Sequence, residues 1–166
     1  NNNFSDMDRV NQIWRHPVYQ EHYKKIQELE SERIFCRHTP EHFLDVARLM
    51  YIYALEEHLE LPKELIYAAA LLHDIGRYAQ YEANLSHHQV GATIGRVLLE
   101  NNGFSEDEIN MICDAIMAHH TIEVDDNNPL KKLLYKADKL SRNCFACCEY
   151  DNCYWEADLK NTKIEY

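Results

Sequence analysis

Residues 61–78 read LPKELIYAAALLHDIGRY, and this stretch decides the fold. It predicts a helix that begins at Pro62, because proline suits the first helical position, and that stops at Gly76. The apolar face of this helix carries His73 and Asp74 inward at its last turn. Buried imidazole and carboxylate groups need a partner, and both are ligands of divalent metal ions. The pair therefore predicts a metal site inside the protein, with an ion pair at a helix end as the plainer alternative.

The rest of the chain also predicts helices, because apolar residues recur at three- and four-residue spacing behind start signals. These signals are Pro17, Thr39 with Pro40, Ser86, Ser105 and Pro129. The first of these helices is expected over residues 17–32. The 166 residues include only four glycines and four prolines, which suits a single helical domain with its own core. We therefore expect one all-α domain of about six to eight helices over residues 1–166.

Four of these helices bring further ligand-type side chains to their apolar sides. The residues are His42, His87, His119 and Asp138. With the pair in residues 61–78 they supply four histidines and two aspartates, enough to hold one or two metal ions. His87 and His119 are each followed by a second histidine, which leaves the choice within each pair open. The spacing to Gly91 and to Ile116 favours the first histidine of each pair.

The charge of the chain limits its partners. It has 28 acidic and 17 basic residues, a net charge of −11. Such a surface repels phosphate backbones and anionic lipids, so duplex nucleic acid and membranes are poor partners. A small anionic substrate stays compatible, because a bound metal reverses the local field. No long apolar stretch or signal-peptide pattern occurs, so we expect a cytoplasmic protein, and the sequence leaves a homodimer open.

The chain has six cysteines, which in a cytoplasmic protein are expected to be thiols or metal ligands rather than disulfides. Four of them cluster near the end of the sequence: Cys144, Cys147, Cys148 and Cys153. Four thiolates could hold a structural zinc ion. The first three also continue the apolar stripe of the helix that begins at Pro129, and buried cysteine behaves as a small apolar residue. We therefore favour core packing, with residues 144–166 packed on the domain.

The arrangement of motifs resembles the HD superfamily of metal-dependent phosphohydrolases. The matching motifs are His42-x-x-x-Val46-Ala47, LLHDIG at residues 71–76, and Ala137-Asp138-Lys139. They occur in the expected order and cover about two thirds of the chain. The resemblance implies a helical HD-domain bundle. It also implies a metal ion held by His42, His73, Asp74 and Asp138.

Two more motifs resemble the extra histidine motifs of dinuclear HD proteins. They are His87-x-x-x-Gly91-Ala92 and Ala115-Ile116-x-x-His119. The small bacterial HD enzymes that split diadenosine tetraphosphate symmetrically share this layout, including an Ala-Asp-Lys segment with an arginine nearby, here Arg142. The cysteine-rich segment is not part of that pattern. Neither the Glu-Asp motif of guanosine-tetraphosphate hydrolases nor the Gly-Tyr-Pro motif of cyclic dinucleotide phosphodiesterases occurs.

Dinuclear phosphoryl chemistry assigns a role to each residue. Asp74 would bridge the two ions, and a metal-bound hydroxide would attack phosphorus in line. One ion would take His42, His73 and Asp138, and the other His87 and His119. His120 would serve a third ion or the leaving group. Asp74 and His120 are therefore the candidate catalytic residues.

Three cations near the motifs are candidates for binding the phosphate oxygens: Arg77, Lys139 and Arg142. Solvated surface charges are the alternative interpretation. The expected cofactor is one or two divalent transition-metal ions. Imidazole and carboxylate ligands accept Fe, Mn, Co, Ni or Zn, and iron is favoured for a dinuclear site.

Three functions fit this pattern. The first is a phosphohydrolase that acts on a nucleotide or another small phosphorylated metabolite. The second is a mixed-valent di-iron oxygenase, because some HD-fold proteins with the same six ligands activate dioxygen. The third is a non-catalytic sensor that binds metal and nucleotide.

Overall fold

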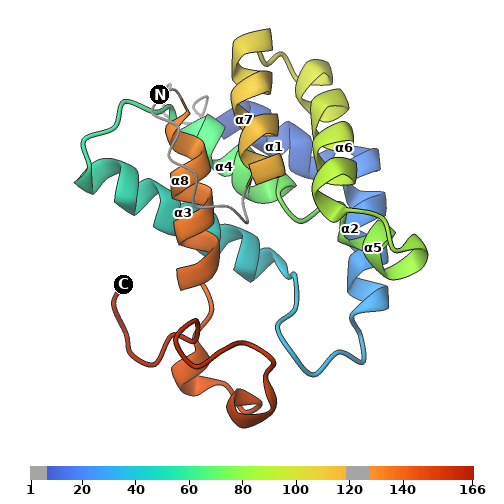
Figure 1. The fold of residues 1–166 in the computed structure, drawn as a ribbon. Coiled ribbons are helices and arrows are strands. Elements are labelled where there is room, and N and C mark those ends of the chain that lie inside the picture. The colour runs from blue at the N-terminus through green and yellow to red at the C-terminus, as the bar shows by residue number, and fades with distance from the viewer. Residues whose placement is uncertain (1–6, 119–127) are drawn as a thin grey trace.

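A computed structural model describes residues 7–118 and 128–166. The described residues form eight α-helices and two short 3-10 helices, with no strand among them (Figure 1). In chain order these are α1 (Asp8–Arg15), α2 (Pro17–Leu29), α3 (Pro40–Glu56), α4 (Lys63–Leu72), α5 (Arg77–Ala83), α6 (His87–Asn101), α7 (Glu106–Ala118), α8 (Pro129–Leu140), η2 (Cys144–Ala146) and η3 (Tyr150–Asn152). The expected all-α bundle is thus confirmed. None of the described helices is both long and apolar enough to cross a membrane.

Helix α4 lies at the centre of the bundle. Helices α1, α3, α6, α7 and α8 all contact it (Figure 1). Its alanines Ala68, Ala69 and Ala70 are wholly buried. A helix that is apolar on all sides belongs in a core, and small alanine side chains let several neighbouring helices approach. The chain that leaves α4 then carries His73 and Asp74 directly into this core.

The expected start signals act as helix caps. Thr39 Oγ1 accepts a hydrogen bond from the backbone N–H of His42 at 3.2 Å, and Ser105 Oγ accepts one from that of Glu108 at 3.2 Å. Prolines stand at the first positions of α2, α3 and α8. These caps and prolines therefore mark where α3 and α8, the helices that carry His42 and Asp138, begin. The helix expected over residues 17–32 ends earlier, at Leu29.

The sequence did not predict α1 or α5, and it misplaced the end of α4. The α4 helix ends at Leu72, and Gly76 lies at the start of α5 rather than at a helix stop. A Cβ atom on Gly76 would lie only 2.3 Å from the carbonyl oxygen of His87 and 2.7 Å from the amide nitrogen of Gly91. Glycine is needed here because the backbone passes so close to α6. This close approach brings the turn at residues 73–76 beside the first turn of α6.

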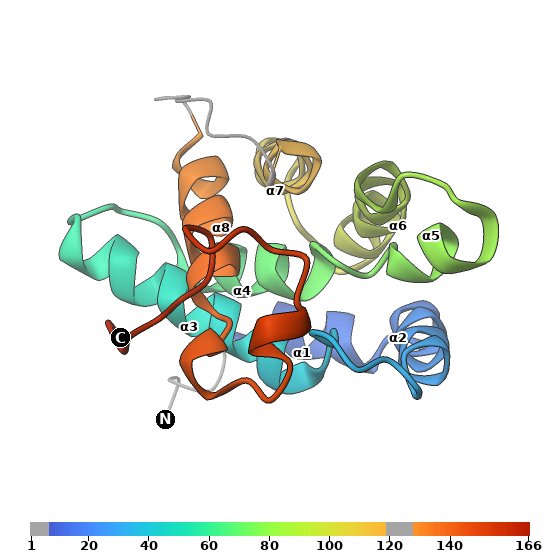
Figure 2. The same cartoon turned by 60° about the horizontal axis from the view of Figure 1, so that its bottom comes forward.

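The C-terminal segment, residues 141–166, contains only η2 and η3 as regular structure. It crosses the same end of the bundle as the connector between α2 and α3 (Figure 2). Because α8 ends at Leu140, helical spacing does not continue to the cysteines. Cys147 and Cys148 are exposed and only Cys144 is buried, so the core-packing interpretation is wrong for these two thiols.

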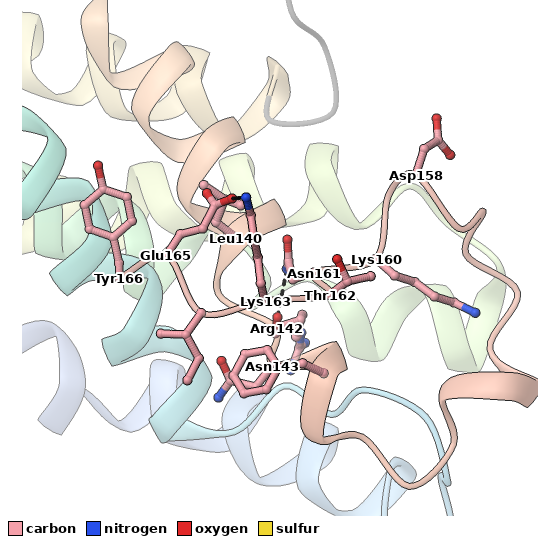
Figure 3. A pocket seen from close by; sticks show the side chains of 12 residues that line it. Leu140, Arg142, Asn143, Asp158, Lys160, Asn161, Thr162, Lys163, Glu165 and Tyr166 are labelled. Carbon is pink, nitrogen blue, oxygen red and sulfur yellow. Dashed lines mark hydrogen bonds and ion pairs between the residues drawn. The ribbon is translucent and has the colours of Figure 1, made fainter.

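Side-chain hydrogen bonds attach this segment to the end of α8. The amide nitrogen of Asn161 donates to the backbone carbonyl of Arg142 at 2.8 Å (Figure 3). The same nitrogen donates to the backbone carbonyl of Lys139, also at 2.8 Å. These carbonyls belong to the last turn of α8 and the residues just after it, where a helix leaves acceptors unsatisfied. At the end of the chain, the Tyr166 hydroxyl donates to a Glu56 carboxylate oxygen at 3.0 Å.

Candidate metal centre

Four of the predicted ligands meet at the centre of the bundle. They are His42 on α3, His73 and Asp74 just after α4, and Asp138 on α8. One ligand atom from each lies within 4.8 Å of all the others. The Nε2 atom of His73 lies 2.9 Å from Asp74 Oδ2 and 3.4 Å from Asp138 Oδ1. The Nε2 atom of His42 lies 3.5 Å and 3.4 Å from the same two oxygens. We call this group the His–Asp site.

The second ring nitrogen of each histidine is held by a neighbour. His73 Nδ1 lies 2.6 Å from the carbonyl oxygen of Ala70, which can only accept, so Nδ1 carries the proton and Nε2 faces the carboxylates. His42 Nδ1 lies 3.4 Å from Ser141 Oγ, and that hydroxyl donates to the carbonyl oxygen of Asp138 at 2.8 Å. Metal-binding histidines are oriented in this way, by a hydrogen bond at the nitrogen that does not bind the metal.

The two ionised carboxylates of the His–Asp site favour a positive charge between them. Burial alone would raise the pKa of Asp74 and of Asp138, but the neighbouring histidines outweigh it and hold both pKa values well below the ordinary range. Burial likewise disfavours charge on His73, yet Asp74 and Asp138 raise its pKa to about 10. In the metal-free protein a proton on His73 therefore supplies the positive charge between the two carboxylates.

The donor set fits one divalent transition-metal ion. Two imidazole nitrogens and two carboxylate oxygens converge, and His73 and Asp74 are at most 1% exposed. Among the described residues, His42 Nε2 has no hydrogen-bond partner, although it faces both carboxylates. Such a buried nitrogen costs stability unless it is satisfied, and a coordinated ion would satisfy it.

A pocket of about 310 Å³ lies at Asp74 and Asp138. The three predicted cations line it, as does His87, which is buried at the first position of α6. The full lining is Arg33, Phe35, Cys36, His38, Asp74, Arg77, Gln80, His87, Asp138, Lys139, Arg142, Cys153, Tyr154 and Trp155. The structure thus brings His87, Arg77, Lys139 and Arg142 to the pocket beside the His–Asp site. His119 and His120 lie outside the described residues.

Two of the three cations are already engaged by the protein. Arg77 Nε donates to Asp74 Oδ1 at 3.3 Å, and Arg142 Nη1 donates to the carbonyl oxygen of Arg37 at 2.7 Å. The ammonium nitrogen of Lys139 lies 5.2 Å from the centre of the Trp155 ring. These contacts hold positive charge at the pocket wall next to the two carboxylates.

A buried histidine that the sequence analysis did not select also faces the site. His38 Nε2 lies 3.7 Å from Asp74 Oδ2, and His38 Nδ1 is hydrogen-bonded to the buried carboxylate of Glu30. Glu30 also accepts from the Tyr81 hydroxyl at 2.6 Å and from the His38 backbone N–H at 2.7 Å. The sequence signal that could have found His38 is its spacing of four residues from His42. His38 itself lies in the connector before α3, which has no helical periodicity.

Opposing effects act on the ionisation of this buried pair. Burial lowers the pKa of His38, while Asp74 and Glu30 oppose this decrease. Burial would raise the pKa of Glu30, but hydrogen bonds from His38 and Tyr81 and the attraction of His38 lower it. The Nδ1 proton of His38 is donated to Glu30, which leaves Nε2 facing Asp74 and the pocket.

Comparison with known proteins agrees with this geometry. Residues 39–143, more than half of the chain, match the HD domain family. A protein of Clostridium beijerinckii described as uncharacterized is 40% identical over 160 residues, which cover 96% of this chain and 100% of that protein. No solved structure matches the chain.

More distant relatives carry a functional name. Ribonuclease Y of Oleidesulfovibrio alaskensis is 32% identical over 126 residues, and that of Geobacter metallireducens 33% identical over 126 residues. Each match covers 76% of this chain but only 22% of the ribonuclease. The chain therefore spans about a fifth of the length of these relatives.

Proposed function

The chain belongs to the HD domain family, and from this we propose that it is a phosphohydrolase that acts on a nucleotide or another small phosphorylated metabolite. The observation that carries the proposal is the convergence of two imidazoles and two carboxylates beside a pocket lined by cations. His42, His73, Asp74 and Asp138 would hold the first divalent ion. When bound, such an ion lowers the pKa of a coordinated water and neutralises charge on a phosphoryl oxygen.

The pocket supports a small anionic substrate. Its volume of about 310 Å³ lies near the lower end of the range for small-molecule sites. Arg77, Lys139 and Arg142 supply positive charge there, while the chain as a whole carries a net charge of −11. A long polyanion such as duplex nucleic acid would meet that acidic surface, whereas a compact phosphate ester would meet mainly the cationic wall. A dinucleoside polyphosphate is the narrower hypothesis.

His87 extends the site toward a second ion. It is buried, lines the pocket and lies beside the turn at residues 73–76. We propose that it joins His119 in holding this ion, with Asp74 as the shared ligand. We assign His38 to the substrate side of the site and Glu30 to a positioning role, because Glu30 fixes the direction of the His38 ring.

Elemental analysis and a panel of phosphate esters, applied to anaerobically purified protein, test this proposal. The Asp74→Asn variant should contain less metal than the wild type and should lose hydrolysis, while its helical circular dichroism is retained. The matched control is Asp45→Asn, an exposed aspartate on α3, which should change neither quantity. Full metal content and full activity in Asp74→Asn would overturn the assignment. Iron that depends on Asp74 without hydrolysis of any ester would instead favour the di-iron oxygenase, and nucleotide binding without turnover would favour the sensor.

A further inference from the structure

Four cysteines from two distant parts of the chain surround one pocket. Cys36 comes from the connector between α2 and α3, and Cys144, Cys147 and Cys153 come from the C-terminal segment. The pocket has a volume of about 210 Å³. Cys148 is next to Cys147 in the sequence but does not line it. The fold thus separates four thiols that share a space from one that does not.

These four thiols are not simply core residues. Cys147 is exposed, Cys36 and Cys153 are half-buried, and all six cysteines of the chain are free thiols. Several apolar side chains of the C-terminal segment are also poorly buried: Phe145, Tyr154, Leu159 and Ile164 are between 43% and 75% exposed. A short segment that cannot bury apolar side chains is commonly held by disulfides or by a metal ion.

The local backbone suits a metal. Cys144 and Cys147 form a Cys-x-x-Cys pair around η2, where the Cys147 N–H donates to the Cys144 carbonyl oxygen at 3.0 Å. A tight turn of this kind presents two thiols from one side of the chain, as in structural zinc sites. Arg142 and Lys160 line the same pocket, so thiolates grouped there around a metal ion would lie beside positive charge.

We propose that Cys36, Cys144, Cys147 and Cys153 form a second metal centre, separate from the His–Asp site, that binds a thiophilic metal as a zinc ion or an iron–sulfur cluster. Both occupants use four cysteine thiolates. Among the described residues, only the His–Asp site has three or more ligand atoms within 4.8 Å of one another. A single zinc ion needs thiolates about 3.8 Å apart and would draw these four together. A cluster spans thiolates that lie farther apart.

Such a centre would hold one wall of the pocket beside the His–Asp site in place. Cys36 and Cys153 line both that pocket and the cysteine pocket. Tyr154 and Trp155, which come directly after Cys153, line the pocket beside the His–Asp site together with Asp74. The Phe35 and Tyr154 rings, with centroids 6.0 Å apart, join the same two parts of the chain. The effect on substrate binding rests on the proposed function, whereas the metal centre itself does not.

Metal analysis in a background that lacks the His–Asp ligand Asp74 separates the two sites. The full chain carrying Asp74→Asn should retain either about one zinc ion per chain or iron with a matching amount of acid-labile sulfide. Adding Cys36→Ser or Cys147→Ser should remove that metal. Adding Cys148→Ser, the matched control, should leave it in place. Zinc without sulfide identifies the single ion, and iron with sulfide identifies the cluster. Metal that is unchanged in Cys147→Ser, or no thiolate-bound metal after reconstitution with zinc and with iron and sulfide, overturns the proposal.

Thiol labelling of the unmutated protein tests the centre without any variant that could misfold. Cys147 and Cys148 are neighbours and both exposed, so they should react equally with iodoacetamide if neither binds metal. We expect Cys147 to be protected together with Cys36, Cys144 and Cys153, and Cys148 to react. Peptide mass spectrometry measures each thiol before and after removal of the metal by a chelator. Equal labelling of Cys147 and Cys148 before chelation, or protection that only a disulfide reductant removes, overturns the proposal.

Discussion

The His–Asp site and the cysteine pocket each gather four potential ligands, but the protein holds them by different means. The first group stands on and beside packed helices, and hydrogen bonds to Ala70 and Ser141 orient its histidines. The second group stands on a connector and a segment with two 3-10 helices of three residues each. The packed core therefore positions the ligands of the His–Asp site without help from a metal. The ligands of the cysteine pocket lie where little apolar packing holds them, so a metal bound there would stabilise the local structure.

The largest expected effect tests the packed side of this comparison. Replacing Gly76 by alanine would place a Cβ atom 2.3 Å from a backbone oxygen of α6, so the turn that carries His73 and Asp74 must shift. We expect the free energy of unfolding to fall by about 3 kcal/mol, as for other overpacked sites, measured by urea denaturation. Metal bound by the cysteine centre should stay.

Gly95→Ala is the matched control, because its Cβ atom would lie 3.5 Å from Leu72 Cδ1, an ordinary contact. In mid-helix this change should alter the free energy of unfolding by no more than about 1 kcal/mol. If Gly76→Ala were as stable as Gly95→Ala, the turn would not be held against α6 as tightly as the structure indicates.

The same contrast explains which features the sequence predicted. The helix starts and the inward positions of His42 and Asp138 follow from caps and helical periodicity, which are local properties. His73 and Asp74 lie in the turn just after α4, beyond the helix in which the periodicity placed them. The contact between Glu30 and His38 joins a helix end to an irregular connector. Helical periodicity cannot predict such a contact. Gly76 reads as a helix stop by itself, and only the neighbouring helix shows that it is needed for close packing.

The cysteines show how a local pattern can mislead. Cys144, Cys147 and Cys148 continue the spacing of the preceding apolar stripe, but α8 ends at Leu140 and the stripe has no helix to continue it. Cys36 stands more than a hundred positions earlier in the chain, and no spacing rule connects it with the other three thiols. Only the path of the chain around the bundle brings the two parts together.

The pH dependence of metal binding should distinguish the two sites. The raised pKa of His73, about 10, means that metal binding at the His–Asp site displaces one proton at neutral pH. Affinity for zinc should therefore rise about tenfold per pH unit, or about 100-fold between pH 6 and 8. Thiols must also lose their protons, and four of them release up to four protons, so the cysteine centre should show a steeper increase. Competition with a chelating dye measures each slope, with Cys147→Ser isolating the first site and Asp74→Asn the second.

The free energy of unfolding of the metal-free protein should depend on pH, because it depends on the proton carried by His73. The folded-state pKa of His73 lies above its ordinary value of 6.5. Its ion pairs with Asp74 and Asp138 therefore stabilise the fold fully below pH 6.5, and this contribution is lost as the pH rises through about 10. Urea denaturation across this range should show the loss in the wild type but not in His73→Ala. If the free energy of unfolding of the wild type did not change with pH over this range, His73 would already be neutral in the folded protein.

The smallest expected effect concerns Glu30, which is neither one of the four ligands nor one of the residues that line the pocket. Its carboxylate contacts the pocket lining through its hydrogen bonds with His38. Glu30→Gln removes the charge that holds the His38 ring, and outer partners of this kind affect metal affinity or activity by about 10- to 100-fold. We expect a fall toward the lower end of that range, with the helical signal and the cysteine-bound metal unchanged. The exposed neighbour Glu32 provides the control variant Glu32→Gln, which should be silent.

A double-variant cycle decides whether Glu30 acts through His38. If it only positions that ring, Glu30→Gln should cost nothing further in the His38→Ala background, because the group it orients is already absent. If the two losses add, Glu30 supports the site by another path, such as its hydrogen bond from Tyr81. Additive losses would also weaken the contrast with the cysteine pocket, since part of the order at the His–Asp site would then come from beyond the helices that carry its ligands.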